Sequence, residues 1–177
     1  MELIEKTLKK EVIYKGSILE LSKEEVLLPD GTTADREIIT HSGGVGIVPI
    51  TEDNKIVLIK QFRNAAKTIT LEIPAGKFEN AEKPEVCAAR ELKEETGYTA
   101  GELISAVNMF ASPAYTSEFD YLYVAKDLKK GIASPDSDEF IQCVEYDIDE
   151  LKEMVFNKQI TDAKTIIGIL IADRYKY

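Results

Sequence analysis

Three glutamates close together in the sequence have the residue type and the spacing for metal chemistry: Glu91, Glu94 and Glu95. At about 100° per residue, a helix would gather these side chains on one face, where Glu91 and Glu95 can point at a common position. Carboxylates held so close raise one another's pKa unless a cation neutralises them. Hard divalent cations favour oxygen ligands, so the spacing indicates a metal site. The alternative interpretation is an ordinary glutamate-rich helix with a solvated face.

The surrounding residues predict a helix from about Pro84 to Thr96. Proline suits the first helical position, where its missing N–H has no partner in any case, and Gly97 suits the left-handed residue that ends a helix. Residues on a second face are expected to pack against a sheet. They are Ala88, Ala89, Leu92 and Thr96. Arg90, among the acids, can pair with Glu82 and hold the preceding loop against the helix.

The whole segment resembles the Nudix box, the signature of the Nudix hydrolase family. The box runs glycine, five residues, glutamate, seven residues, Arg-Glu, an aliphatic residue, any residue, Glu-Glu, any residue and glycine. The matching residues, in order, are Gly76, Glu82, Arg90, Glu91, Leu92, Glu94, Glu95 and Gly97. Tyr98 departs from the usual aliphatic residue after the final glycine, which should affect packing rather than metal binding.

This resemblance implies a fold and a set of metal ligands. The fold is of the α+β class, a Nudix-type α/β/α sandwich with a mixed central sheet, preceded by a small N-terminal antiparallel β-region. Glu91 and Glu95 are expected as the principal ligands of two or three Mg²⁺ or Mn²⁺ ions, with Glu94 and the backbone carbonyl of Ala75 as further ligands. Arg90 and Glu94 are also expected to take part in catalysis.

Signals outside the box resemble the ADP-ribose pyrophosphatase subgroup. The first is Ser112-Pro113-Ala114-Tyr115, which has alanine where the subgroup has glycine. The second is Lys60-Gln61-Phe62-Arg63 together with Leu71 to Gly76. The third is the N-terminal segment from Leu28 through Arg36 to His41, which resembles the arm through which these enzymes dimerise. The resemblance implies that Arg63, Glu72 and Pro113 contact the substrate. It also places Arg36 near the adenine end.

The resemblance also implies that the water-activating base comes from an acidic loop after the box, and Asp136 to Phe140 occupies that place in this sequence. Glu139 is the first choice, and Asp138 and Glu118 remain alternatives. His41, the only histidine, is expected to have a structural role.

The resemblance implies hydrolysis of ADP-ribose to AMP and ribose 5-phosphate. Another nucleoside diphosphate sugar or a dinucleoside polyphosphate is an alternative substrate, and a non-catalytic nucleotide sensor is an alternative function. Without the resemblance, the chain would be interpreted as an acidic α+β protein that binds other proteins through a solvated glutamate face.

The elements that must position these residues follow from hydrophobic patterning and turn signals. Strands are expected at 12–14, 18–28, 45–50, 55–61, 68–73, 103–110, 119–125 and 140–146, and helices at 149–156 and 162–175. Thr51-Glu52-Asp53-Asn54 is predicted to join two of the strands as a hairpin loop. Residues 1–40 are interpreted as an N-terminal β-region. The resemblance implies that this region forms a dimerisation arm and that residues 41–177 form the hydrolase domain.

Composition narrows the class of protein further. The 177 residues suit one globular domain with an extension, and the net charge of −10 argues against binding to nucleic acid. No apolar run approaches the ~18 residues of a membrane span, so a cytoplasmic location is expected. The resemblance implies a homodimer that acts on a small molecule. Cys87 and Cys143 are interpreted as core thiols, because two cysteines make no disulfide framework.

Overall fold

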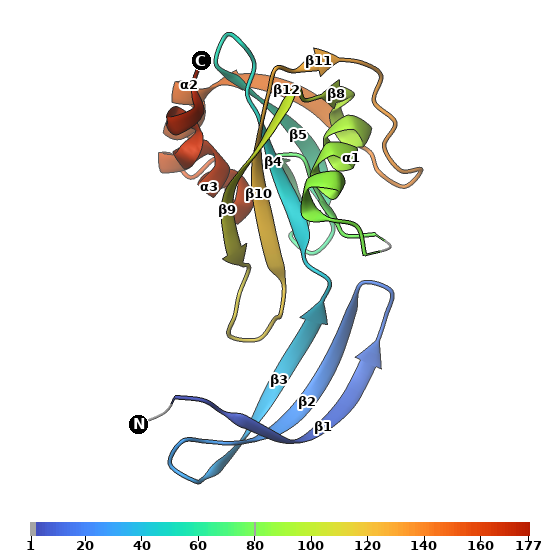
Figure 1. Ribbon diagram of the computed structural model, residues 1–177, viewed down its shortest axis with the longest axis vertical. Coiled ribbons are helices and arrows are strands. Elements are labelled where there is room, and N and C mark those ends of the chain that lie inside the picture. The colour runs from blue at the N-terminus through green and yellow to red at the C-terminus, as the bar shows by residue number, and fades with distance from the viewer. Residues whose placement is uncertain (1–2, 80) are drawn as a thin grey trace. The chain divides into compact units, whose positions relative to one another are not determined.

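The computed structural model describes residues 3–79 and 81–177 (Figure 1). Contacts within the chain define two compact units. One consists of Met1–Gly43 with Met109–Asp120, and the other of Gly44–Asn108 with Tyr121–Tyr177. Within the described residues, no helix is both long and apolar enough to cross a membrane.

The N-terminal unit contains an antiparallel sheet of three strands in the order β1-β2-β3. The strands are β1 (Lys6–Lys15), β2 (Leu19–Leu27) and β3 (Thr33–His41). The turn expected at Leu28 to Gly31 is confirmed, because Gly31 has a φ of 88° and donates its N–H to the Leu28 carbonyl. The first strand is longer than the predicted 12–14, and β3 was not predicted as a strand.

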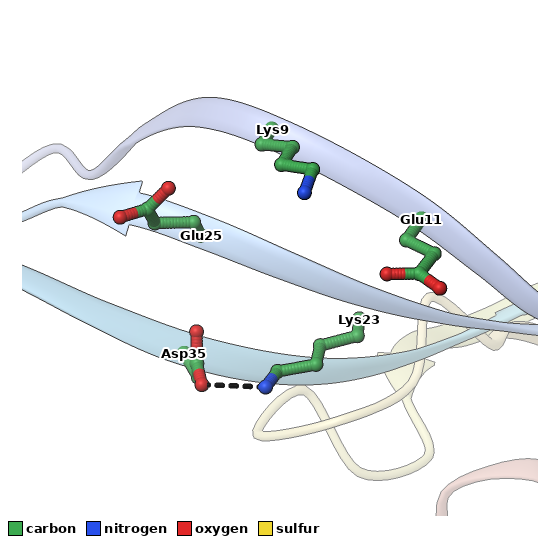
Figure 2. A pocket seen from close by; sticks show the side chains of 5 residues that line it. All are labelled: Lys9, Glu11, Lys23, Glu25 and Asp35. Carbon is green, nitrogen blue, oxygen red and sulfur yellow. Dashed lines mark ion pairs between the residues drawn. The ribbon is translucent and has the colours of Figure 1, made fainter.

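Alternating charges cover part of one face of this sheet. Figure 2 shows the side chains, which come from all three strands: Lys9, Glu11, Lys23, Glu25 and Asp35. The Lys23 ammonium lies 2.8 Å from an Asp35 carboxylate oxygen. Such a face remains solvated, because each charge has neighbours of opposite sign and no apolar cover.

The second unit holds the remaining elements in layers. The strands are β4 (Gly44–Pro49), β5 (Lys55–Arg63), β6 (Thr68–Glu72), β7 (Ala75–Lys77), β8 (Tyr98–Thr99), β9 (Glu102–Phe110), β10 (Phe119–Lys126), β11 (Lys129–Lys130) and β12 (Gln142–Asp147), of which β9 and β10 run on into the first unit. They form the sheets β7-β4-β10-β9 and β12-β5-β6 and the short pair β11-β8. The helices are α1 (Pro84–Thr96), α2 (Ile148–Phe156) and α3 (Ala163–Ile171), and a 3-10 turn follows at Ala172–Tyr175.

Strand β4 is the centre of the core, since all six of its residues are buried. Both α1 and α3 pack against it, and Figure 1 shows these helices on opposite sides of the sheet. On the α3 side, a Cβ at Gly168 would lie 2.8 Å from Val48, so glycine allows the helix to approach closely. Asp162 caps this helix by accepting a hydrogen bond from the Thr165 N–H at 2.8 Å.

The structure corrects the expected hairpin between β4 and β5. The turn at Thr51 to Asn54 is present, but the two strands belong to different sheets, and the residues that flank the turn pair at the isolated bridge between Ile50 and Ile56. Both edges of β4 are already paired, with β7 and β10, so β5 cannot join it in a ladder. The short strands β7, β8 and β11 were not predicted, and the last predicted helix ends earlier and continues as a 3-10 turn.

Two packing predictions are also wrong. Ala89 is exposed, and buried Cys87 takes the place expected for it on the packed side of α1. Cys143 is exposed rather than a core thiol, because β12 is an edge strand whose residues are only partly covered.

Both predicted ends of α1 are confirmed. Pro84 opens the helix, and Gly97 ends it with a φ of 76° and an N–H that donates to the Lys93 carbonyl. A Cβ at Gly97 would lie 2.7 Å from the backbone N of Ala133, so the position requires glycine for conformation and for space.

We therefore predict that Gly97→Ala destabilises the protein by more than the roughly 1–2 kcal/mol that left-handed backbone alone costs an L-residue. Gly31→Ala is the matched control, because Gly31 also has positive φ but a Cβ there would meet nothing within 4 Å. Urea unfolding followed by circular dichroism compares the two. Equal losses of stability in the two variants would show that the contact with Ala133 carries no cost.

Candidate active site

Two of the three glutamates lie on the packed side of α1. Glu91 and Glu95 are only 9% and 4% exposed, and they share the buried arc of the helix with Ala88 and Leu92. The sequence had suggested one face for packing and another for the acids. The two carboxylates instead enter the protein, and Glu94 remains half-exposed at the edge of that arc.

The backbone of β7 meets both buried carboxylates. A Cβ at Gly76 would lie 1.9 Å from Glu91 Oε1, so any side chain there would occupy the space of the carboxylate. The Ala75 N–H donates to Glu95 Oε2 at 2.9 Å. Because β7 pairs with β4 in the central sheet, the close approach between strand and helix is set by the core.

Burial makes these carboxylates hard to ionise. It raises the pKa of Glu91, and it raises the pKa of Glu95 to about 8 against the hydrogen bond from Ala75. The neighbouring negative charge of Glu139 raises the pKa of both groups further. A site of this kind takes up a proton or a cation readily.

Arg90 supplies the positive charge in contact with Glu91. Its guanidinium lies 2.6 Å from Glu82, 2.8 Å from Glu91 and 2.9 Å from Glu94. The predicted pair with Glu82 is thus confirmed, and the guanidinium lowers the pKa of Glu82 to about 2. Arg90 also donates to the Lys77 carbonyl at 3.2 Å, which ties the loop before α1 to the helix.

The site fits a divalent cation by its chemistry. In residues 3–79 and 81–177, no three His, Cys, Asp or Glu side chains are arranged as a ready metal-binding group. Arg90 engages oxygens of both Glu91 and Glu94. Two buried carboxyl groups of raised pKa nevertheless provide hard oxygen donors, and a divalent cation such as Mg²⁺ or Mn²⁺ can bind them in exchange for a proton.

The acidic loop is tied to the end of α1 through the segment that precedes it. The Gly131 N–H donates to the Gly97 carbonyl and the Ser134 N–H to the Glu94 carbonyl, each at 2.9 Å. Further along, the Asp136 N–H donates to the Glu139 carboxylate at 3.2 Å. Nothing in the sequence pattern had pointed to Gly131 and Ser134, because their part is played by backbone atoms.

The two alternative bases lie in different parts of the structure. Asp138 is exposed in the same loop. Glu118 belongs to the N-terminal unit, where its carboxylate is 3.8 Å from His41 Nδ1. His41 has the expected structural contact, since its Nδ1 accepts the Gly43 N–H at 3.1 Å.

Arg63 and Glu72, both expected to contact substrate, pair with each other. The contacts are bidentate, with Nε 2.8 Å and Nη2 2.6 Å from the two carboxylate oxygens of Glu72. Burial alone would raise the pKa of Glu72, but hydrogen bonds from Arg63 and Thr70 hold it below its usual value. The pair leaves Nη1 of Arg63 outside these contacts.

The other expected substrate residues lie in the N-terminal unit. Arg36 forms an ion pair with Glu5. Pro113 lies in a turn that closes through hydrogen bonds from the Tyr115 and Thr116 N–H groups to the Ser112 carbonyl. Ala114, which replaces the subgroup's glycine, does not have a positive φ, so the turn accommodates alanine without strain.

The raised pKa of Glu95 gives a testable pH dependence. Without metal, the folded protein holds this proton up to about pH 8, whereas an unfolded glutamate releases it near pH 4.3. The group's contribution to stability is therefore complete below about pH 4.3 and is lost as pH rises through about 8. We predict that saturating Mg²⁺ raises Tm by at least about 3 °C more at pH 8.5 than at pH 5.5.

The control for that measurement is Glu95→Gln at matched ionic strength, in which the difference between the two pH values should shrink. A Mg²⁺ effect in the wild-type protein that is the same at both pH values would contradict this assignment.

Comparison with known proteins agrees with the geometry. A family model described as "NUDIX domain" matches residues 40–166, and one described as "Nucleoside diphosphate sugar hydrolase N-terminal domain" matches residues 5–39. A solved structure titled "Crystal structure of ADP compounds hydrolase" superposes with a TM-score of 0.85, covering 97% of this chain and 93% of that one. At 20% identity, this likeness shows the fold alone, the expected α/β/α sandwich.

Curated relatives cover nearly the whole chain. A protein of Bacillus methanolicus named "Methanol dehydrogenase activator" is 42% identical over 93% of this chain and 90% of its own length. An "ADP-ribose pyrophosphatase" of Bacillus subtilis is 38% identical, over 94% of this chain and 91% of its own length. With the family model, the relatives and the glutamate helix in agreement, the chain belongs to the Nudix family and is a hydrolase.

Proposed function

We propose that this hydrolase cleaves the pyrophosphate bond of a nucleoside diphosphate sugar, with ADP-ribose as the preferred substrate and AMP and ribose 5-phosphate as products. The observation that carries the reaction type is the buried pair Glu91 and Glu95 against the backbone of β7. The substrate class is supported by the N-terminal match at residues 5–39 and by relatives named ADP-ribose pyrophosphatase and GDP-mannose pyrophosphatase.

Divalent metal is the required cofactor in this proposal. Glu91 and Glu95 would hold Mg²⁺ or Mn²⁺, two or three ions in all, with Glu94 and the carbonyl of Ala75 as further ligands. When bound, such ions polarise phosphoryl oxygens and lower the pKa of a bound water. Arg90, whose guanidinium lies 2.6 Å from Glu82, would keep the loop before α1 in place through that pair.

Glu139 accepts the proton from the attacking water in this account. Its charge acts on both Glu91 and Glu95, which supports a place beside the reacting atoms. The Asp136 N–H, bonded to one of its carboxylate oxygens, orients it. Arg63, aligned by Glu72, offers Nη1 to a substrate phosphate.

The second candidate function is control of a partner protein by a Nudix domain that binds nucleotide without turnover. The specific observation behind it is the relative named for activating methanol dehydrogenase, at 42% identity. The two candidates differ in whether bound nucleotide is cleaved.

We predict that AMP forms faster from ADP-ribose with Mg²⁺ than from other nucleotide sugars, diadenosine polyphosphates or nucleoside triphosphates. Glu95→Gln should slow this reaction by roughly 100-fold or more, because the carboxylate charge that holds metal is lost. Glu85→Gln is the matched control, since Glu85 is exposed in the first turn of the same helix. Product chromatography provides the measurement.

Each other outcome has a distinct meaning. Faster cleavage of another nucleotide would overturn the choice of ADP-ribose and keep the reaction type. Binding of ADP-ribose with no cleavage of any nucleotide would favour control of a partner protein.

The base is tested by removing each candidate carboxylate. Glu139→Gln should lower kcat by about 10² to 10⁴ with little change in KM, as expected for loss of a general base. Asp138→Asn and Glu118→Gln are matched losses of charge and should have little effect. A larger loss in either of these variants than in Glu139→Gln would reassign the base.

We further propose that the N-terminal unit forms a homodimer with a second copy of the chain. Every residue of β1 is exposed, including Leu8, Val12 and Tyr14, and β1 lies at a sheet edge. Sedimentation analysis should give a dimer for the wild type and a monomer for Val12→Glu with Tyr14→Glu. A monomeric wild type would refute the proposal.

A further inference from the structure

A cavity of about 410 Å³ adjoins the pair formed by Arg63 and Glu72. One side comes from β5, β6 and the turn between them, and the other from the connection that leads into α3 and the first turn of that helix. The lining residues are Arg63, Ala66, Thr70, Glu72, Thr161, Asp162 and Lys164. Its volume lies within the range of small-molecule sites.

The lining is polar but balanced in charge. Arg63 and Lys164 are cationic, Glu72 and Asp162 are anionic, and Arg63 is already neutralised by its bidentate contact with Glu72. A phosphate group favours a site with excess positive charge. Fixed charges of both signs, with the hydroxyls of Thr70 and Thr161, suit a neutral ligand that carries many hydroxyl groups.

Asp162 is held in place by α3. Its Oδ2 accepts hydrogen bonds from the Thr165 N–H at 2.8 Å and the Thr165 hydroxyl at 2.7 Å. Thr165 is fully buried and in turn accepts the Ile73 N–H at 2.8 Å, just before the strand that carries Gly76. The cavity wall is therefore rigidly connected to the backbone that meets the two buried glutamates.

We infer that this cavity binds the sugar half of a nucleoside diphosphate sugar, with Thr161 and Lys164 as specificity-determining residues. The inference rests on the proposed function, which supplies the substrate class. Arg63 connects the two regions: its guanidinium lines the cavity, and the charges of Glu95 and Asp162 both act on it. A substrate whose phosphate contacts Arg63 would then extend its sugar towards Thr161 and Lys164.

The test compares two substrates that differ only in the sugar. ADP-ribose and the methyl ester of ADP carry the same pyrophosphate charge, but the ester lacks the terminal ribose. Thr161→Val and Lys164→Met should each raise KM for ADP-ribose about three- to tenfold, the loss expected for one hydrogen bond, and leave KM for the methyl ester unchanged. Lys158→Met is the matched control, because Lys158 is exposed in the same connection but does not line the cavity.

A second readout is independent of turnover. Calorimetric titration without divalent metal should show weaker binding of ADP-ribose, and not of the methyl ester, in the two cavity variants. This readout separates the inference from the proposed function, because it holds even if the wild-type protein cleaves neither compound.

Two results would overturn the inference. Equal changes in KM or affinity for ADP-ribose and the methyl ester, or no change for either, would show that the cavity does not bind the sugar. A larger loss of affinity for ATP than for ADP-ribose in Lys164→Met would show that the cavity binds a terminal phosphate instead.

Discussion

The burial of two carboxylates on the packed side of one helix is the constraint on which the rest of this site depends. Glu91 and Glu95 lie where a helix ordinarily places apolar side chains, on the same buried arc as Ala88 and Leu92. An ionised carboxylate without compensation is unfavourable at such a position. The negative charge of these carboxylates therefore has to be compensated by a proton, a guanidinium or a metal ion. Without metal, protonation and the Arg90 guanidinium provide this compensation.

The surrounding architecture fixes the space around these groups. Strand β4 is paired on both edges and covered on both faces. Because β7 pairs with β4 and α1 packs against it, β4 fixes the positions of both elements relative to each other. Gly76 leaves room for the Glu91 carboxylate, and Gly97 turns the chain so that the acidic loop is tied to the end of the helix. Glycine is therefore required at the two ends of the box for different physical causes: space for a carboxylate at Gly76, and backbone conformation and close packing at Gly97.

The sequence predicted the parts of the site whose signals are local. Pro84 and Gly97 defined the helix ends, and the pair of Arg90 with Glu82 followed from spacing along one helix and its preceding loop. The predictions that proved wrong depended on how strands pair and on which side of a helix meets the sheet. Nothing near Thr51 to Asn54 showed that both edges of β4 were already taken, and nothing near Ala89 showed which arc of α1 would meet the sheet.

The same distinction applies to the substrate residues. Arg63 and Glu72 were separately expected to contact substrate, but their bidentate pair with each other emerges only when β5 and β6 lie side by side. Thr161 and Lys164 had no motif at all, and their place in the cavity follows from the packing of α3 against the sheet. Tertiary contacts, which short sequence patterns do not encode, decide such positions.

The most direct test of the account is to count the protons released when metal binds. Calorimetric titration of Mn²⁺ at pH 7, repeated in buffers of different ionisation enthalpy, gives this number. Because Glu95 has a pKa of about 8 without metal, binding should release about one proton at pH 7, almost none at pH 9.5, and fewer in Glu95→Gln. Tight binding of Mn²⁺ with no proton release at pH 7, or no binding at all, would contradict the claim that buried glutamates exchange a proton for a cation.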